Sequence, residues 1–287
     1  MMYTSAAPNA KCKSGSMNRR ESFSLNSLPP DLDKVIDDAW SATKDVPGFL
    51  GENEARFLGL VAACVLAQGV IVEIGSFKGR STVMLAKVAA HYGLGPVVSI
   101  DPHTRILSPV RPDDTGGSTY DDFLASLRGA GVEKHVEVHR AFSMDVQQTW
   151  DRPIRFLWID GDHSYEGAHQ DFAGFLPFVN ALGVVALHDA LNNFPGPVRV
   201  FVEEMLRARQ FGPAGFVHSI AWAQLRPQDA ANFRGQREKL ARRVAPLIPI
   251  TQQHPELRGW SKIRYKLLRS RVPRKPISAA ELAQLLS

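Results

Sequence analysis

The sequence has few cysteines and no long apolar run. Its 287 residues contain two cysteines, Cys12 and Cys64; this number excludes a disulfide framework, and no Cys/His cluster has the spacing of a zinc site. The richest apolar stretch, residues 57–72, is interrupted by Gln68 and is shorter than the ~20 residues that a membrane span needs. The first thirty residues contain no apolar segment of the kind found in secretory signals. These absences predict a cytoplasmic protein.

Basic residues are concentrated near the carboxyl end. Residues 226–287 contain 14 Lys and Arg against 4 Asp and Glu, whereas residues 1–225 carry a net charge of −5. Residues 1–28 are rich in Ser, Asn and basic residues, and such a segment buries too little apolar surface to offset the entropy lost on ordering. We therefore expect a flexible leader over residues 1–28, a globular domain over residues 29–225 and a basic helical extension over residues 226–287.

Short β-branched runs alternate with helical segments through the globular part. The first run, Val70 to Ile74, is apolar apart from Glu73, as in a strand covered on both faces. Such alternation predicts right-handed crossovers, an α/β fold and a mostly parallel sheet with helices on both faces. The expected strands cover residues 70–74, 97–101, 135–139, 154–160 and 183–187, with a late strand or hairpin over residues 216–225.

A glycine loop follows the first expected strand. Gly75 and Gly79 let the backbone turn sharply and approach a ligand closely, and the N-terminus of the following helix favours anions. The spacing G-x-x-x-G differs from the G-x-G-x-x-G of dinucleotide sites, and no G-K-[ST] follows as in a P-loop. Asp101, at the end of the second expected strand, can accept the hydroxyls of a ribose. Taken alone, the loop also fits an ordinary strand–helix turn.

Four segments together closely resemble the class I S-adenosylmethionine-dependent methyltransferases, and among them methyltransferase family 24. They are Val72 to Thr82, Ile100 to Pro102, Ile159 to Gly167 and Leu187 to Ala190. The third segment, the run IDGDHSYEG, is the most specific. The resemblance covers about residues 50–210 and implies a Rossmann-like fold, with a seven-stranded sheet that includes an antiparallel strand near its end.

The resemblance also implies a cofactor, S-adenosylmethionine, and residues that bind it. The glycine loop is expected to border the methionine part, Asp101 to hold the ribose and Ser143 to lie near the adenine. The expected cofactor-binding residues are Glu73, Gly75, Ser76, Gly79, Ser81, Asp101, Ser143 and Asp160.

Acidic residues also end two later strands. Asp160 and Asp189 can converge on one point, where a divalent cation such as Mg²⁺ would relieve their repulsion. By resemblance to metal-dependent O-methyltransferases, Asp160, His188 and Asp189 are the expected metal ligands, and His163 is the general base beside Asp160. An imidazole at His188 suits Mg²⁺ poorly. Three alternatives therefore stay open: Mn²⁺ binds instead, His188 serves as a second acid/base group, or no metal binds.

Apolar residues recur at helical spacing in the basic extension. They include Trp260, Ile263 and Leu267, interleaved with Lys and Arg. This pattern fits a basic amphipathic helix on an anionic membrane surface. It fits equally a helix that docks on the sheet domain or on a second subunit of a homo-oligomer. No nucleic-acid-binding motif is present, so we expect no nucleic-acid partner.

The residues and the resemblance together predict an S-adenosylmethionine-dependent methyltransferase. The expected acceptor is a hydroxyl on a sugar, a glycoside or another small natural product. Two alternatives stay open. One is a non-catalytic cofactor-binding or scaffold protein of the same fold, and the other is a metal-dependent oxidative enzyme that uses Asp160, His188 and Asp189.

Overall fold

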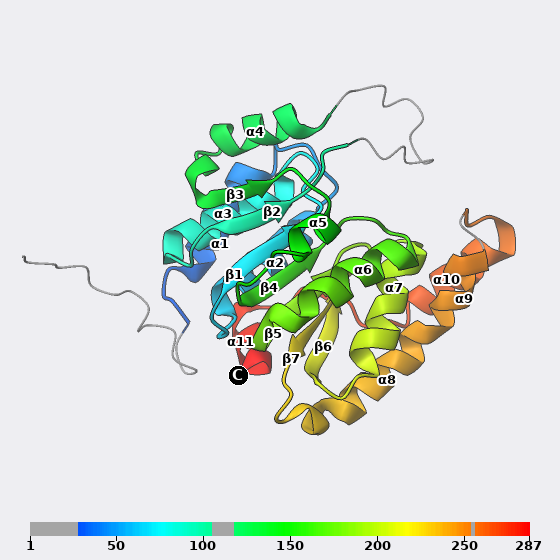
Figure 1. Cartoon of the computed structure of the whole chain (residues 1–287). Coiled ribbons are helices and arrows are strands. Elements are labelled where there is room, and N and C mark those ends of the chain that lie inside the picture. Colours follow the sequence, from blue (N-terminus) through cyan, green and yellow to red (C-terminus); the bar gives the residue numbers. More distant parts are fainter. Residues whose placement is uncertain (1–27, 105–117, 254–255) are drawn as a thin grey trace, which may run out of the picture.

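A seven-stranded sheet forms the centre of the protein (Figure 1). The computed structural model describes residues 28–104, 118–253 and 256–287. The strands follow the order β3-β2-β1-β4-β5-β7-β6, and all neighbouring pairs are parallel except those made by β7, which is antiparallel to both β5 and β6. The strands are β1 (Val70–Ile74), β2 (Val97–Ile100), β3 (Val136–His139), β4 (Ile154–Ile159), β5 (Val179–Leu187), β6 (Phe211–Val217) and β7 (Ile220–Leu225).

The predicted Rossmann-like, mostly parallel sheet is thus confirmed. The five early strands lie where the β-branched runs predict them, although β5 begins at Val179, four residues before the expected start. The late segment is a hairpin that begins at Phe211, five residues earlier than expected. It supplies the antiparallel strand that the family resemblance implies.

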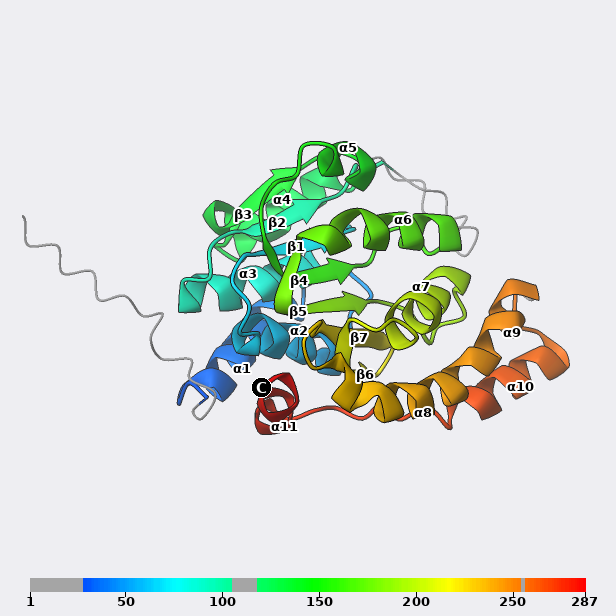
Figure 2. The same ribbon diagram turned by 60° about the horizontal axis from the view of Figure 1, so that its bottom comes forward.

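Helices cover both faces of the sheet (Figures 1 and 2). The helices α1 to α4 and α11 pack on one face, and α5 to α10 pack on the other face and beyond the β6 edge. The helices are α1 (Leu32–Thr43), α2 (Glu52–Cys64), α3 (Arg80–Tyr92), α4 (Tyr120–Gly129), α5 (Ser143–Gln147), α6 (Tyr165–Phe175), α7 (Pro195–Val200), α8 (Arg234–Val244), α9 (Ile248–Gln253), α10 (Gly259–Arg269) and α11 (Ala279–Leu286). A π-helix, Phe201–Leu206, continues α7.

The period-two alternation of the strands divides the apolar side chains between two cores. On β4, Phe156 and Trp158 point into the core beneath α2 and α3, whereas Leu157 and Ile159 join the core beneath α6. All four side chains are buried. Because β1, β2, β4 and β5 pair in parallel, their carboxyl ends meet along one edge of the sheet.

The basic extension packs on the sheet. The buried guanidinium of Arg237 on α8 donates hydrogen bonds to the carbonyl oxygens of Phe211 and Gly212, which fixes α8 against β6. After α10 the chain returns beneath the sheet, and α11 packs on α2. All but the last residue of the predicted leader, residues 1–28, lies outside the described residues. Among the described helices, none has the length and apolarity needed to cross a bilayer.

The buried face of α11 provides a test of this packing. Leu282 is fully buried, whereas Leu285 on the same helix is exposed. Leu282→Ala should lower the free energy of unfolding by about 2–5 kcal/mol because it leaves a cavity against α2. Leu285→Ala, the control, should change it by less than about 0.5 kcal/mol. Urea unfolding of both variants measures the difference; equal effects would mean that α11 does not pack as described.

Candidate functional site

Gly75 joins the ends of three strands at very short range. Its φ of +84° is one that other residues rarely adopt, and a Cβ atom here would lie 2.3 Å from the carbonyl oxygen of Asp160. The amide of Gly75 donates to the carbonyl of Ile100 at 2.9 Å, and the amide of Asp160 donates to that of Ile74 at 2.8 Å. The glycine therefore holds the loop after β1 directly against the start of the loop after β4.

Glu73 anchors the glycine loop from inside. It is wholly buried at the end of β1, and its two carboxyl oxygens accept the hydroxyls of Ser81 and Thr82 from the first turn of α3. Burial raises the pKa of Glu73 to about 7, although these hydroxyls oppose the shift. The contacts link the strand to the helix on either side of the loop. The side chains of Glu73 and Ser81, both predicted to bind the cofactor, thus point toward each other and hold the two ends of the glycine loop together.

Asp101 organises the other side of the same loop. Its Oδ2 accepts the amides of Ser76 and Phe77, both at 2.8 Å, and its Oδ1 accepts the amide of His103 at 2.6 Å. Phe77 adopts a φ of +48°, a conformation that costs a non-glycine residue free energy. A carboxylate has about four acceptor positions. Donors from the described residues occupy three of them, which leaves a position at Oδ1 for a further donor such as a ribose hydroxyl.

Ser143 lies at the start of α5, after β3. Its hydroxyl donates to the buried carboxyl of Asp171 on α6, and burial raises the pKa of Asp171 to about 6. The two neighbours of Ser143, Phe142 and Met144, are large apolar side chains that are about half exposed. An exposed apolar pair at a strand end is suited to contact a flat ring such as an adenine, and the sequence analysis did not single out either residue.

Asp160, His163 and Asp189 come together at the ends of β4 and β5. The Nε2 atom of His163 lies 3.6 Å from Oδ1 of Asp160 and 3.4 Å from Oδ2 of Asp189. The ring of His163 also lies against Phe194, with 4.4 Å between centroids. Asp189 reaches this position with a φ of +56°, an unusual conformation for a residue other than glycine that turns the chain sharply after β5.

His188 lies beside both carboxylates of the predicted ligand set, and its contact with Asp189 runs from Nδ1 to Oδ1 over 3.6 Å. Its Nδ1 lies 3.0 Å from Oδ1 of Asp160, and its Nε2 lies 3.6 Å from Oε2 of Glu54. The alternation of β5 puts His188 on the face covered by α2, as for Ala186 two residues earlier. His188 is therefore buried among three carboxylates, those of Asp160 and Asp189 at the sheet edge and that of Glu54 on a helix.

Glu54 is the member of this cluster that the sequence analysis missed. It is buried on α2 and accepts hydrogen bonds from the amides of Gly51 and Ser219, at 3.1 Å each, and from the Ser219 hydroxyl. The available signal was a glutamate that directly precedes the apolar residues of α2, Ala55 and Phe57, in a helix buried against the sheet. In sequence alone it looks like an ordinary first-turn acid that favours the helix N-terminus.

Opposite charges dominate the electrostatics of the cluster. Burial alone would lower the pKa of His163, yet Asp160 and Asp189 raise it to about 9. Asp160 and Glu54 also raise the pKa of His188 well above its usual value, against the effect of burial. In turn, the imidazoles hold the pKa of Asp160 below its ordinary value although burial opposes this. In the absence of a bound metal ion, the carboxylates therefore favour the cationic form of both imidazoles.

The donor atoms of Asp160, His163 and Asp189 fit a divalent cation. One ligand atom from each residue lies within 4.8 Å of the others, close enough for the three to share one ion, and two carboxylates with one imidazole suit Mn²⁺ and related metals. This group contains His163, whereas the predicted ligand set was Asp160, His188 and Asp189. The predicted set also lies together, because Nδ1 of His188 faces both Asp160 and Asp189, while its Nε2 faces Glu54.

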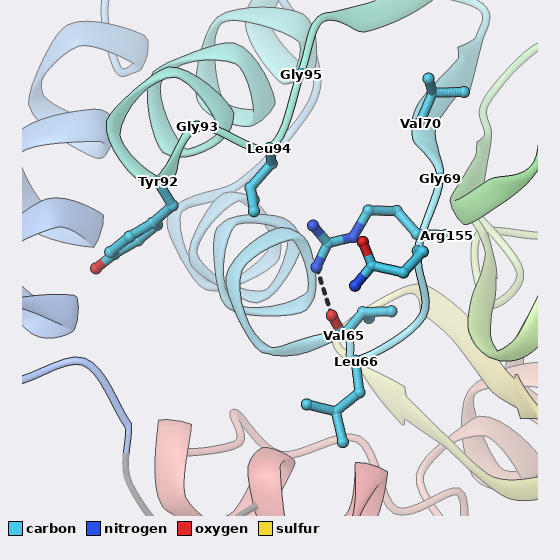
Figure 3. Close-up of a pocket in the computed structure, with 10 residues that line it drawn as sticks. Val65, Leu66, Gly69, Val70, Tyr92, Gly93, Leu94, Gly95 and Arg155 are labelled. Atoms are coloured by element: carbon cyan, nitrogen blue, oxygen red, sulfur yellow. Dashed lines mark hydrogen bonds between the residues drawn. The ribbon is translucent and has the colours of Figure 1, made fainter. Parts of the chain in front are cut away.

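A cavity of about 330 Å³ lies at the opposite edge of the sheet (Figure 3). Residues at the amino end of β1 and the carboxyl ends of α2 and α3 line it, together with Arg155. The Arg155 guanidinium donates a hydrogen bond to the carbonyl of Val65 at its wall (Figure 3). Since Gly75 and Asp160 follow the carboxyl ends of their strands, this cavity is separate from the candidate site.

Comparisons with known proteins agree with this geometry. Residues 72–190 match a family described as a methyltransferase domain. This range begins in β1 and includes the glycine loop, Asp101 and the acid–imidazole cluster of Asp160, His163 and Asp189. It therefore contains the residues that form the candidate site, apart from Glu54.

Solved structures share the fold at low sequence identity. NovP, an O-methyltransferase, is 14% identical over 68% of this chain and 98% of its own, with a TM-score of 0.54. Cofactor-bound Rv0187 from MTB is 21% identical, covers 71% of this chain and 93% of its own, and has a TM-score of 0.50. An O-methyltransferase described as putative, from Klebsiella pneumoniae, is 17% identical, covers 70% of this chain and 92% of its own, and also has a TM-score of 0.50. These likenesses support the fold.

The close approach at Gly75 can be tested by substitution. Gly75→Ala combines a positive φ with a clash against the Asp160 carbonyl, whereas Gly93, also at positive φ (+63°), has no atom within 4 Å of the added Cβ. We expect Gly93→Ala to cost about 1 kcal/mol of unfolding free energy and Gly75→Ala about 3 kcal/mol or more. Urea unfolding measures both. Similar losses in the two variants would show that the strand ends are not packed together at Gly75.

Proposed function

We propose that this protein, whose residues 72–190 match a methyltransferase domain, is a class I S-adenosylmethionine-dependent methyltransferase that transfers the methyl group to a hydroxyl of a small acceptor. The observation that carries this proposal is the meeting of two sites at Gly75. On one side lies the loop organised by Asp101, and on the other lies the cluster of Asp160, His163 and Asp189. One site is suited to a nucleoside cofactor, and the other is suited to move a proton.

Methyl transfer requires mainly alignment and removal of a proton. The sulfonium of the cofactor carries the activated methyl group, so the protein needs to position the acceptor and its hydroxyl. His163 is the proposed base because its Nε2 lies at the cluster's centre, beside Asp160 and Asp189. These carboxylates orient the ring and stabilise the imidazolium that forms. The acceptor class we propose is a sugar, a glycoside or another small natural product.

We also propose that Asp160 and Asp189 hold a divalent cation, Mg²⁺ or Mn²⁺, with His163 next to it. A cation bound there would lower the pKa of an acceptor hydroxyl. The proposal rests on two carboxylates that meet at one point beside an imidazole. The oxidative alternative would use His188 as a ligand, whose Nδ1 lies 3.0 Å from Oδ1 of Asp160 and 3.6 Å from Oδ1 of Asp189. The scaffold alternative predicts cofactor binding without methyl transfer to any acceptor.

The cofactor part of the proposal can be tested at Asp101. Asp101→Asn removes the negative charge of the carboxylate that accepts the loop amides and, in our proposal, a ribose hydroxyl. Binding of S-adenosylhomocysteine should therefore weaken at least tenfold. Calorimetry of the folded variant measures this. Asp121→Asn, on the exposed surface of α4, makes the same charge change and should bind as the wild type does. Unaltered binding by the Asp101 variant would overturn its assignment.

The role of His163 can be tested through the pH dependence of the reaction. Because its pKa is raised to about 9, the neutral, proton-accepting form becomes more abundant as pH rises. The profile of kcat/KM should therefore climb with pH, with its midpoint near pH 9, and level off above that. His163→Gln should lower kcat by about 10²–10⁴-fold and abolish this climb. Transfer of labelled methyl groups to extracted sugars or glycosides provides the assay.

A surface histidine of α6 provides the control for that experiment. His169→Gln, remote from both carboxylates of the cluster, should leave the rate and its pH profile unchanged. If His163→Gln behaves in the same way, His163 is not the base. If the wild type binds the cofactor but labels no extracted acceptor, the scaffold alternative is favoured instead.

Metal binding can be measured without an acceptor. Mn²⁺ added to the protein should lose its free electron paramagnetic resonance signal as it binds, and Asp189→Asn should weaken this binding at least tenfold, since one of two carboxylate ligands is lost. Asp145→Asn, an exposed acid on α5, is the matched control. Equal Mn²⁺ binding by both variants would refute a metal site at Asp189.

A further inference from the structure

The helix α10 exposes a row of large apolar side chains. The exposed fractions are 84% for Trp260, 57% for Ile263 and 56% for Leu267. Their spacing of three and four residues puts them on one side of the helix. On the inner side, Tyr265 is buried in the core. The helix is therefore already packed through its inner side, and the outer row is not required for that packing.

Basic residues flank the apolar row. Lys262, Arg264 and Lys266 are exposed on α10, and no acidic residue occurs between Glu256 and Glu281. None of these three basic residues takes part in the ion pairs found within the described part of the chain. Their charges are therefore available to a partner of opposite sign.

The inner side of α10 is fixed to the loop that follows Asp189. The amide of Asn193 donates to the hydroxyl of Tyr265 at 2.9 Å, and the guanidinium of Arg269 donates to Oδ1 of Asn192 at 3.2 Å. Asn192 in turn donates to Oδ1 of Asp189. The exposed row thus lies behind a segment of the candidate site. In Figure 2, α10 extends beyond the sheet on the β6 side, next to α8 and α9.

We propose that α10 docks the protein on the surface of an anionic lipid bilayer. The Trp, Ile and Leu side chains would enter the boundary between head groups and acyl chains, and the basic side chains would contact anionic head groups. Tryptophan is well suited to that boundary because its ring has an apolar body and a polar N–H. The helix lies in the plane of the surface and does not span it.

Charge complementarity favours lipid over a second copy of the chain. A symmetric dimer through α10 would put Lys262, Arg264 and Lys266 of one copy against the same residues of the other, since a two-fold interface pairs each surface patch with itself. Such like charges repel. An anionic bilayer accepts the apolar row and all three charges at once. The docking surface is independent of the proposed methyl transfer.

Vesicle flotation with the full-length protein tests the docking surface. The protein should float with vesicles of phosphatidylcholine and phosphatidylglycerol, remain unbound with phosphatidylcholine alone, and dissociate as salt is raised. Two triple variants, Trp260→Ala/Ile263→Ala/Leu267→Ala and Lys262→Gln/Arg264→Gln/Lys266→Gln, should each reduce partitioning at least tenfold. The fluorescence of Trp260 should shift to shorter wavelength in the presence of the anionic vesicles.

A matched control separates this surface from general basic charge. Lys239→Gln/Arg242→Gln/Arg243→Gln removes three exposed charges from α8 and should retain most of the binding. Equal losses in the α8 and α10 charge variants would overturn the proposal, as would failure of the wild type to float with anionic vesicles. Self-association by light scattering that only the α10 variants abolish, without flotation, would assign the surface to a second copy instead.

Discussion

The candidate site depends on the backbone contact between Gly75 and Asp160. At this point two parallel strands end so close together that no side chain fits between the loops that follow them. The contact puts the loop organised by Asp101 beside the cluster of Asp160, His163 and Asp189. Without it, the carboxyl ends of β1 and β4 would move apart, and the two halves of the site would no longer face a common space.

Charge balance is the second constraint. Glu54 on α2 is buried, Asp160 and Asp189 at the sheet edge are partly exposed, and the two imidazoles between them offset the repulsion of the three carboxylates. Removing one partner from such a group leaves an uncompensated charge in a poorly solvated place. The same two carboxylates, Asp160 and Asp189, raise the pKa of His163 to about 9. The charges that stabilise the cluster therefore also set the pH at which His163 can accept a proton.

Local sequence patterns could predict much of this arrangement. The strands β1, β2 and β4 are apolar runs that each contain one polar residue, and Gly75 and Asp101 follow the ends of β1 and β2, so the parallel topology brings them together. The strand β6 was harder to predict from the sequence, because Gly212, Pro213 and Gly215 interrupt its apolar pattern. A glycine or proline within a run usually indicates a loop, and here pairing with β7 outweighs that local preference.

Contacts between distant segments could not be predicted in the same way. Glu54 reaches His188 across 134 positions of sequence, and nothing near either residue marks the pair. The inner side of α10 raises the same difficulty, since the contact of Tyr265 with Asn193 depends on how the basic extension folds back. Periodicity predicts that a helix has an apolar face, but the three-dimensional packing decides which side chains stay exposed.

A crystal structure with S-adenosylhomocysteine bound would test the central claim most directly. We expect the homocysteine part at the loop of Gly75 and Gly79, a ribose hydroxyl at Oδ1 of Asp101, and the sulfur facing the side of the cluster where His163 lies. Binding of the ligand in the cavity beside Arg155, or anywhere else away from the carboxyl ends of the strands, would contradict the account.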